Sequence, residues 1–138
     1  MPSFKIFDVA GSGMSAQSVR LNTVASNLAN ADSISGDPKA VYKARHPIFE
    51  AVKSAMQSQE GGNAAVKVKT IMESQAAPAA RYEPGNPLAN AEGYVYAPNV
   101  NVVEEMVDMI SASRAYQNNV EVMNTSKELM LATLRLGQ

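Results

Sequence analysis

Apolar residues recur every three or four positions along the last third of the chain. This spacing is the heptad pattern of a helix that packs along a coiled-coil seam. All positions of the series except Ser113 and Lys127 are apolar. The ten positions are Val102, Met106, Met109, Ser113, Tyr116, Val120, Met123, Lys127, Met130 and Leu134. A helix of this length extends over about 50 Å, whereas a compact chain of this size has a radius of gyration of about 14 Å. The pattern therefore predicts a stripe too long for one chain to bury, so that a partner must cover it.

The ends of this helix are marked by capping residues, which predict a helix over 102–136. Asn101 is a suitable N-cap, and Glu104 occupies the reciprocal capping position three residues later. Gly137 is a stop signal, and neither proline nor glycine interrupts the segment before it. We therefore expect one uninterrupted helix.

The N-terminal part of the chain carries a second, weaker copy of the same pattern. Its seam positions, of which only Gln17 is polar, are Phe7, Ala10, Met14, Gln17, Leu21, Val24, Leu28 and Ala31. Gly11 and Gly13 each weaken a helix by about 1 kcal/mol relative to alanine. We therefore predict a continuous helix only from about residue 12 to residue 30, with a frayed start.

Residues 34–98 differ in composition from the two ends and favour a small β-rich module. Valine alternates with lysine over 66–70, which is typical of a half-buried strand. We predict a turn at 61–63 and a short strand at 94–96, whereas 40–59 is ambiguous because Pro47 excludes one continuous helix. Extended chain is expected over most of 78–98.

These predictions together indicate an α+β fold with a discontinuous domain. Residues 1–33 and 99–138 are expected to pair as a coiled coil of long terminal helices, and residues 34–98 to form the central module.

Composition excludes several functional classes. The net charge of −1 provides no basic surface for nucleic acid or for an anionic membrane. No apolar run is long enough for a membrane span, and the N-terminus lacks the basic and apolar regions of a cleaved secretion signal. The chain has no cysteine, so neither a disulfide nor a thiolate metal site can form.

Catalytic chemistry is poorly supported, and we expect neither an enzyme nor a cofactor or metal site. The single histidine, His46, precedes a proline and has no acidic neighbour before Glu50. Glu104, Glu105 and Asp108 have the donor type of a hard-metal or acid–base site, but we interpret them as a solvated first turn at the positive end of the helix dipole. The tyrosines are expected to serve packing and not base stacking.

Methionine and asparagine are concentrated in the two predicted helices. Methionine adapts to non-identical neighbours, and asparagine is a poor helix former whose presence inside helices favours hydrogen bonds across an interface. The predicted assembly interface consists of Met14, Leu21, Val24, Asn27, Leu28, Asn30, Val102, Met106, Met109, Tyr116, Asn119, Val120, Met123, Met130 and Leu134.

Three segments resemble the bacterial flagellar basal-body rod protein family. Residues 25–33 (ASNLANADS) are similar to the end of the N-terminal helix in that family. Residues 93–107 (GYVYAPNVNVVEEMV) and 111–124 (SASRAYQNNVEVMN) are similar to the C-terminal region of its proximal rod members. Together the two ends cover about half of the chain.

The resemblance implies a structural subunit that is exported unfolded by the flagellar type III apparatus, without a cleaved signal. Such subunits assemble helically, through paired terminal helices, into the rod that transmits torque across the periplasm. The implied partners are further copies of this chain, the rod proteins FlgB, FlgF and FlgG, the adaptor FliE and the membrane ring at the rod base. A small helical adaptor or secretion chaperone that forms a closed dimer is the alternative, and it differs in that it does not polymerise.

Overall fold

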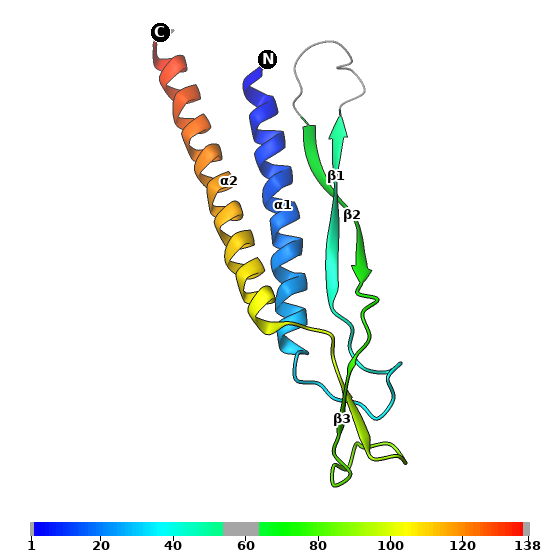
Figure 1. Ribbon diagram of the computed structural model, residues 1–138. Helices are drawn as coiled ribbons and strands as arrows, with labels where there is room; N and C mark the ends of the chain where they lie inside the picture. Colours follow the sequence, from blue (N-terminus) through cyan, green and yellow to red (C-terminus); the bar gives the residue numbers. More distant parts are fainter. Residues whose placement is uncertain (1, 54–63, 137–138) are drawn as a thin grey trace.

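The computed structural model describes residues 2–53 and 64–136 of the 138-residue chain, and it shows an α+β fold. Helix α1 (Pro2–Ala29) comes first and helix α2 (Val102–Leu136) last, with four strands between them: β1 (Arg45–Lys53), β2 (Ala64–Glu73), β3 (Ala79–Tyr82) and β4 (Tyr94–Ala97). The helices lie side by side, and α1 stands between α2 and the ribbon formed by β1 and β2 (Figure 1). Of the described elements, only α1 contacts α2.

Helix α2 has the predicted bounds and the predicted N-cap. The side-chain Oδ1 of Asn101 accepts a hydrogen bond of 3.1 Å from the amide of Val103, and its carbonyl accepts the first intrahelical bond from the amide of Glu105 at 3.0 Å. These two bonds satisfy amide groups that a helix N-terminus otherwise leaves unpaired.

Helix α1 is longer than predicted, since it is continuous from Pro2 through Gly11 and Gly13. The physical reason lies in the packing against α2. A Cβ atom added at Gly13 would lie 2.9 Å from Nδ2 of Asn119, so the missing side chain lets the two helices approach. The intrinsic cost of glycine is thus offset by a tertiary contact that the local pattern does not reveal.

Strands β1 and β2 form a two-stranded antiparallel ribbon, which confirms the strand predicted around 66–70. The ambiguous segment 40–59 contributes β1, whereas the turn predicted at 61–63 lies outside the described residues. The register shifts between Ile48 and Phe49, whose partners are Thr70 and Val68, so Lys69 is the extra residue of a bulge. An ion pair of 3.1 Å joins Arg45 to Glu73 across the two strands.

Strands β3 and β4 form a second antiparallel pair, which lies beyond the ends of the helices where α1 finishes and α2 begins (Figure 1). Strand β4 confirms the short strand predicted at 94–96. The rings of Tyr82 and Tyr94 meet edge to face with centroids 5.2 Å apart, which is the packing role expected of tyrosine here. Gly93 has φ +84°, a backbone conformation that glycine adopts without strain.

The buried core is unusually small in both extent and side-chain size. Within the described ranges, every buried apolar residue is alanine or valine: Ala10, Ala16, Val24, Val41, Ala44, Val95, Ala97 and Ala112. The accessible surface is 9739 Å², whereas a compact monomer of this mass exposes about 6,900 Å². The chain is therefore elongated, and its larger apolar side chains lie at or near the surface. Neither described helix is both long and apolar enough to cross a membrane.

Candidate assembly site

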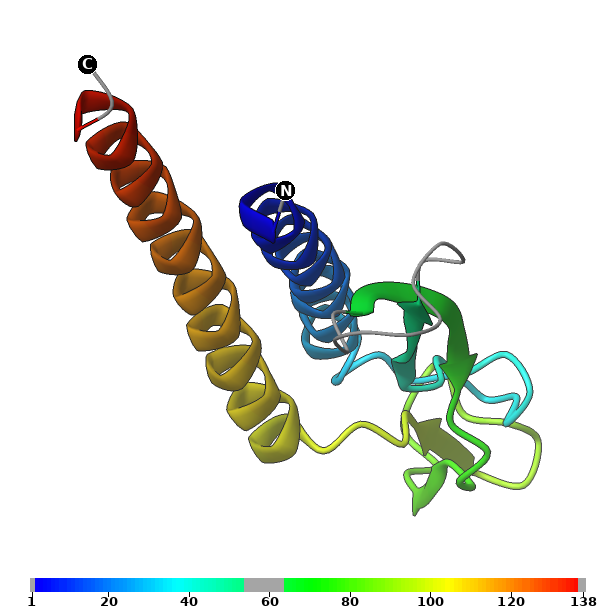
Figure 2. The ribbon, with the colours of Figure 1, turned by 90° about the horizontal axis from the view of Figure 1, so that it is seen from above.

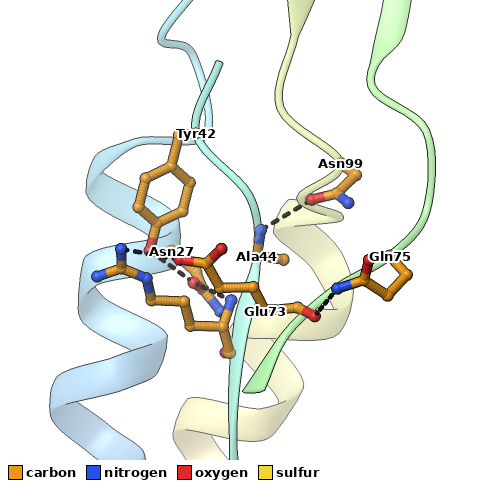
Figure 3. A network of polar contacts seen from close by, with 7 residues as sticks. Asn27, Tyr42, Ala44, Glu73, Gln75 and Asn99 are labelled. Atoms are coloured by element: carbon orange, nitrogen blue, oxygen red, sulfur yellow. Dashed lines mark hydrogen bonds and ion pairs between the residues drawn. The ribbon is translucent and has the colours of Figure 1, made fainter. Parts of the chain in front are cut away.

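Asn27 is the centre of a buried polar junction that joins three parts of the chain. Its side chain is 0% exposed. Its Nδ2 donates to the carbonyl of Arg45 (2.8 Å) and to Oε1 of Glu105 (2.9 Å). Its Oδ1 accepts from the hydroxyl of Tyr42 (2.9 Å, Figure 3) and from the amide of Arg45 (2.9 Å). Both donors and both acceptor positions of the amide are thus used.

The two bonds between Asn27 and Arg45 reproduce those of a neighbouring strand. The amide oxygen of Asn27 accepts a hydrogen bond from the main-chain N–H of Arg45, and the amide nitrogen donates one to the C=O of Arg45. Antiparallel strands pair in the same way. Because these groups point away from β2, the edge of β1 is closed at this position by a side chain of α1. Pro47, two residues further along, also lies on this edge and removes no bond from the ladder.

A second side chain of α1 holds the other end of the ribbon. Oγ of Ser12 accepts a hydrogen bond of 3.1 Å from the amide of Val66 in β2. Ser12 and Asn27 are about 22 Å apart along the helix, and β1 covers a similar length, about 20 Å, between Arg45 and Ala51, the residue paired with Val66. The ribbon is therefore anchored along α1 at two points.

Asn99 connects the segment before α2 to the start of β1. Its Oδ1 accepts from the amide of Ala44 at 2.8 Å (Figure 3), and its Nδ2 donates to the carbonyl of Ala76 at 2.7 Å. The residues that precede both β1 and α2 are thereby held together next to the Asn27 junction.

Glu105 and Asp108 correct the interpretation of a solvated first turn. Glu105 is only 4% exposed on the side of α2 that contacts α1, and Asn27 donates to it. Its Oε2 atom is buried without a hydrogen-bond partner among the described residues. Asp108 forms an ion pair of 2.7 Å with Arg20 of α1. Only Glu104 has the exposed position that was expected of all three.

Tyr42 lies beside the charged groups of this junction. Burial raises the pKa of its hydroxyl above the usual value of 10.0, and the negative charges of Glu105 and Glu73 act in the same direction. The guanidinium of Arg45 lies 5.6 Å from the centre of the tyrosine ring and opposes this rise in the pKa.

The residues of the predicted interface occupy three kinds of position. Val24 and Asn27 are buried inside the chain. Nine others are half-buried: Met14, Leu21, Leu28, Asn30, Met109, Asn119, Val120, Met123 and Met130. Val102, Met106, Tyr116 and Leu134 are exposed. The structure thus brings most of the predicted seam towards the space between α1 and α2 and leaves both ends of the α2 stripe uncovered.

The contact between the two helices is centred on small and polar residues, of which the apolar pattern had selected only Ala10. The deepest positions of α2 are Glu105 and Ala112, neither of which belongs to the predicted seam. On α1, Ala10, Gly13 and Ala16 face the closely packed region. Small residues permit a close approach of helix axes. As a result, larger apolar side chains of α2 are turned outward.

Four exposed apolar residues form one continuous surface near the start of α2, which we call the α2 strip. They are Val103 (70% exposed), Met106 (54%), Val107 (60%) and Ile110 (55%). At 100° per residue they lie on the side of the helix opposite Glu105, Met109 and Ala112. Only Met106 was among the predicted interface residues. Positions 103, 107 and 110 have the same heptad spacing as the seam positions 102, 106 and 109, shifted by one residue. This spacing is the sequence signal for the three strip residues that were not predicted.

A groove, which we call the end groove, lies between the two helices near the opposite end of the pair. It has a volume of about 170 Å³ and is lined by Ile6, Ser126, Leu129, Met130 and Thr133. The helices diverge towards this end, as both views show (Figures 1 and 2). Leu129 is 63% exposed here and Ile6 is 46% exposed.

The described residues offer little for catalysis or metal binding. Within residues 2–53 and 64–136 no three histidine or acidic side chains are grouped so that they could hold a metal ion. His46 lies exposed on β1. The prominent features are instead a buried polar junction and two uncovered apolar surfaces, which are typical of a protein that associates with other chains.

Comparison with known proteins defines the class. Residues 7–33 match the family described as flagella basal body rod protein, and residues 91–136 match the family described as flagellar basal body rod FlgEFG protein C-terminal. The chain therefore belongs to the flagellar basal-body rod protein family, a class of structural proteins and not of enzymes.

Within this class the similarity to proteins named flagellar basal-body rod protein FlgC covers the full length. The chain is 56% identical to that of Escherichia coli O157:H7 and 55% identical to that of Salmonella typhimurium, over 138 residues and all of both chains. It is 41% identical over 135 residues to that of Aquifex aeolicus, covering 96% of each chain. The family expected from the three sequence segments is confirmed.

Proposed function

We propose that this chain is a structural subunit of the proximal rod of the bacterial flagellar basal body, which assembles helically through its terminal helices into a torque-transmitting shaft. Membership of the rod family supports the role in the rod. The observation that carries the mode of assembly is the α2 strip, because four large apolar residues are more than half exposed on one helix face.

Energetic considerations favour an open array over an isolated pair. Covering the remaining area of the α2 strip contributes on the order of 1–2 kcal/mol per side chain, or roughly 4–8 kcal/mol for all four. This sum is comparable to the lower part of the roughly 4–15 kcal/mol that association costs. A single contact therefore barely holds two copies together. Several contacts per copy, as in a helical array, give a stable assembly.

We further propose that the chain is organised for this role in two parts. Residues 1–33 and 99–138 form the layer in which the terminal helices pair as a coiled coil, and residues 34–98 form the part that sets the spacing of neighbouring subunits. The side-by-side arrangement of α1 and α2 supports the first part. The two anchors of the β1–β2 ribbon, Ser12 and Asn27, support a fixed position of the second part relative to the first.

The proposed partners are other copies of this chain, the rod proteins FlgB, FlgF and FlgG, the adaptor FliE and the membrane ring at the rod base. The proposed location is the rod where it crosses the periplasm, reached through the flagellar type III export apparatus without a cleaved signal. Family membership supports these assignments.

Two measurements test the proposed function. The chain is produced in Salmonella typhimurium that lacks its own FlgC, and swimming in soft agar and purified basal bodies are examined. We expect restored swimming and the chain within isolated rods. Light scattering of the purified chain at rising concentration separates the alternatives, because an adaptor or chaperone stops at a closed dimer whereas a rod subunit continues to grow. A closed dimer that does not restore swimming would contradict the proposal.

A further inference from the structure

The two uncovered apolar surfaces of the helical pair lie at opposite ends of it. The α2 strip follows the N-terminus of α2, whereas the end groove is formed by the C-terminal part of α2 and the beginning of α1. Val107 and Leu129, which lie near the middle of these two surfaces, are 22 residues apart on one helix, or about 33 Å. A copy of the chain therefore carries a convex apolar surface at one end and a concave one at the other.

The shapes of the two surfaces are complementary. Val103, Val107 and Ile110 have the i, i+4, i+7 spacing of a helix that inserts into an apolar groove. Of the two hydroxyl groups that line the groove, that of Thr133 does not oppose such an insertion. Thr133 donates its hydroxyl to the carbonyl of Met130 at 2.8 Å, so its hydrogen bond is satisfied within α2 and its methyl group remains for contact.

The charges beside the two surfaces are also complementary. Glu104 is exposed next to Val107, three residues before it on the helix, and Lys127 is exposed three residues before Met130 of the groove. Because Glu104 and Lys127 have opposite charges, a contact of strip with groove brings an attractive pair together.

We propose that the α2 strip of one copy packs into the end groove of the next copy, with Glu104 of the first near Lys127 of the second. This contact is heterologous, because each copy contacts one neighbour through its α2 strip and the other neighbour through its end groove. Repetition of such a contact produces a head-to-tail series, which is open when the rotation between copies does not close a ring, and not a two-fold dimer. The proposal rests on the proposed rod function and identifies the surfaces through which successive copies meet.

Cysteine cross-linking tests this contact directly, since the natural chain has no cysteine. Val107→Cys and Leu129→Cys are prepared as separate full-length chains, distinguished by a small tag, mixed at high concentration and oxidised. We expect a mixed disulfide dimer that contains one chain of each kind, because a disulfide requires Cα atoms about 4.4–6.8 Å apart. Ser111→Cys is the matched control, as it is exposed one turn beyond Val107, at the edge of the strip and about 90° around the helix from its middle.

The products distinguish the arrangements. A Val107→Cys and Leu129→Cys mixture that forms mixed dimers well above the level with Ser111→Cys supports the head-to-tail contact. Dominant dimers of Val107→Cys with itself, or no excess over the control, would overturn it. If the variants still restore swimming in Salmonella typhimurium that lacks its own FlgC but give no mixed dimer, this contact is wrong and the rod function remains.

A charge exchange provides an independent measurement. Glu104→Lys alone is expected to raise the concentration needed for assembly by about two- to fivefold, the effect of one exposed ion pair. A mixture with Lys127→Glu chains should restore assembly at the original concentration, because the lysine of a Glu104→Lys strip then meets the glutamate beside the groove of a Lys127→Glu chain. Lack of restoration, with both variants folded, would count against the proposed orientation.

Discussion

The amide of Asn27 donates a hydrogen bond of 2.9 Å to the carboxylate of Glu105, across 78 positions of the sequence. This buried bond joins the end of the first helix to the first turn of the last one. Because Asn27 also closes the edge of β1 through Arg45, one side chain sets the relative position of both helices and of the ribbon. The junction therefore holds the rigid unit from which the α2 strip is presented.

Replacement of Asn27 by alanine should be strongly destabilising. The change removes the partner of the buried Glu105 and of three part-buried groups, namely the hydroxyl of Tyr42 and both main-chain groups of Arg45. We expect the free energy of unfolding in urea to fall by about 3 kcal/mol or more. Asn30→Ala is the matched control, since the side chain of Asn30 bonds, among the described residues, only to the carbonyl of Ser26 within its own helix turn, and a loss below about 1 kcal/mol is expected. Equal losses in the two variants would contradict the role of Asn27.

Glu105 should tolerate glutamine better than alanine. Glutamine keeps an oxygen that accepts from Asn27, and it removes a buried charge that forms no ion pair with the residues the structure describes. We expect Glu105→Gln to be at least as stable as the natural chain in thermal unfolding at pH 7, and Glu105→Ala to lose about 1–3 kcal/mol because Asn27 is left with an unpaired donor. A glutamine variant less stable than the alanine variant would show that the carboxylate charge itself is required.

The two glycines of α1 should respond to alanine in opposite ways. Nothing lies within 4 Å of a Cβ atom added at Gly11, so Gly11→Ala should stabilise the helix by about 1 kcal/mol. A Cβ atom at Gly13 would meet Asn119 at 2.9 Å and displace the side chain that donates to the carbonyl of Ala115. Gly13→Ala should therefore be less stable than Gly11→Ala by about 1–3 kcal/mol.

The double variant Gly13→Ala, Asn119→Ala serves as the control for this interpretation. It removes the obstructing amide and should recover part of the loss in thermal unfolding. A Gly13→Ala chain as stable as Gly11→Ala would show that the helices do not approach closely at this point.

Tyr42 should make the stability decrease at alkaline pH. Its pKa is raised in the folded chain, mainly by burial, so the unfolded chain loses this proton first as the pH rises above about 10. The contribution of Tyr42 to the free energy of unfolding is fully present below that pH and is lost as the pH rises towards the pKa of Tyr42 in the folded chain. Comparison of urea unfolding at pH 8 and pH 11 should show a smaller decrease for Tyr42→Phe than for the natural chain, and equal decreases would exclude this effect.

The sequence alone was sufficient for the elements with strong local signals. The cap at Asn101 and the uninterrupted heptads predicted α2 correctly, and the alternation of valine and lysine predicted β2. Family segments at both ends identified the class. These features depend on neighbours within a few residues, and the pattern of one chain contains that information.

The details that were missed depend on contacts between distant segments. The start of α1 was wrong because the role of Gly13 arises from Asn119 on another helix. The burial of Glu105 arises from its contact with α1, whereas its sequence position favoured a solvated turn. The apolar pattern also selected large residues for the seam, although alanine and glycine make the closest contacts, so the α2 strip was found only when burial was known.

The central claim is that the α2 strip is a surface for assembly, and the most direct test is a charge placed within it. Val107→Asp and Ser111→Asp are compared as purified chains and in Salmonella typhimurium that lacks its own FlgC. Val107 is 60% exposed, so both variants should unfold at nearly the temperature of the natural chain. We predict that Val107→Asp is absent from isolated rods and abolishes swimming, whereas Ser111→Asp is incorporated. Normal rods that contain Val107→Asp would contradict the account.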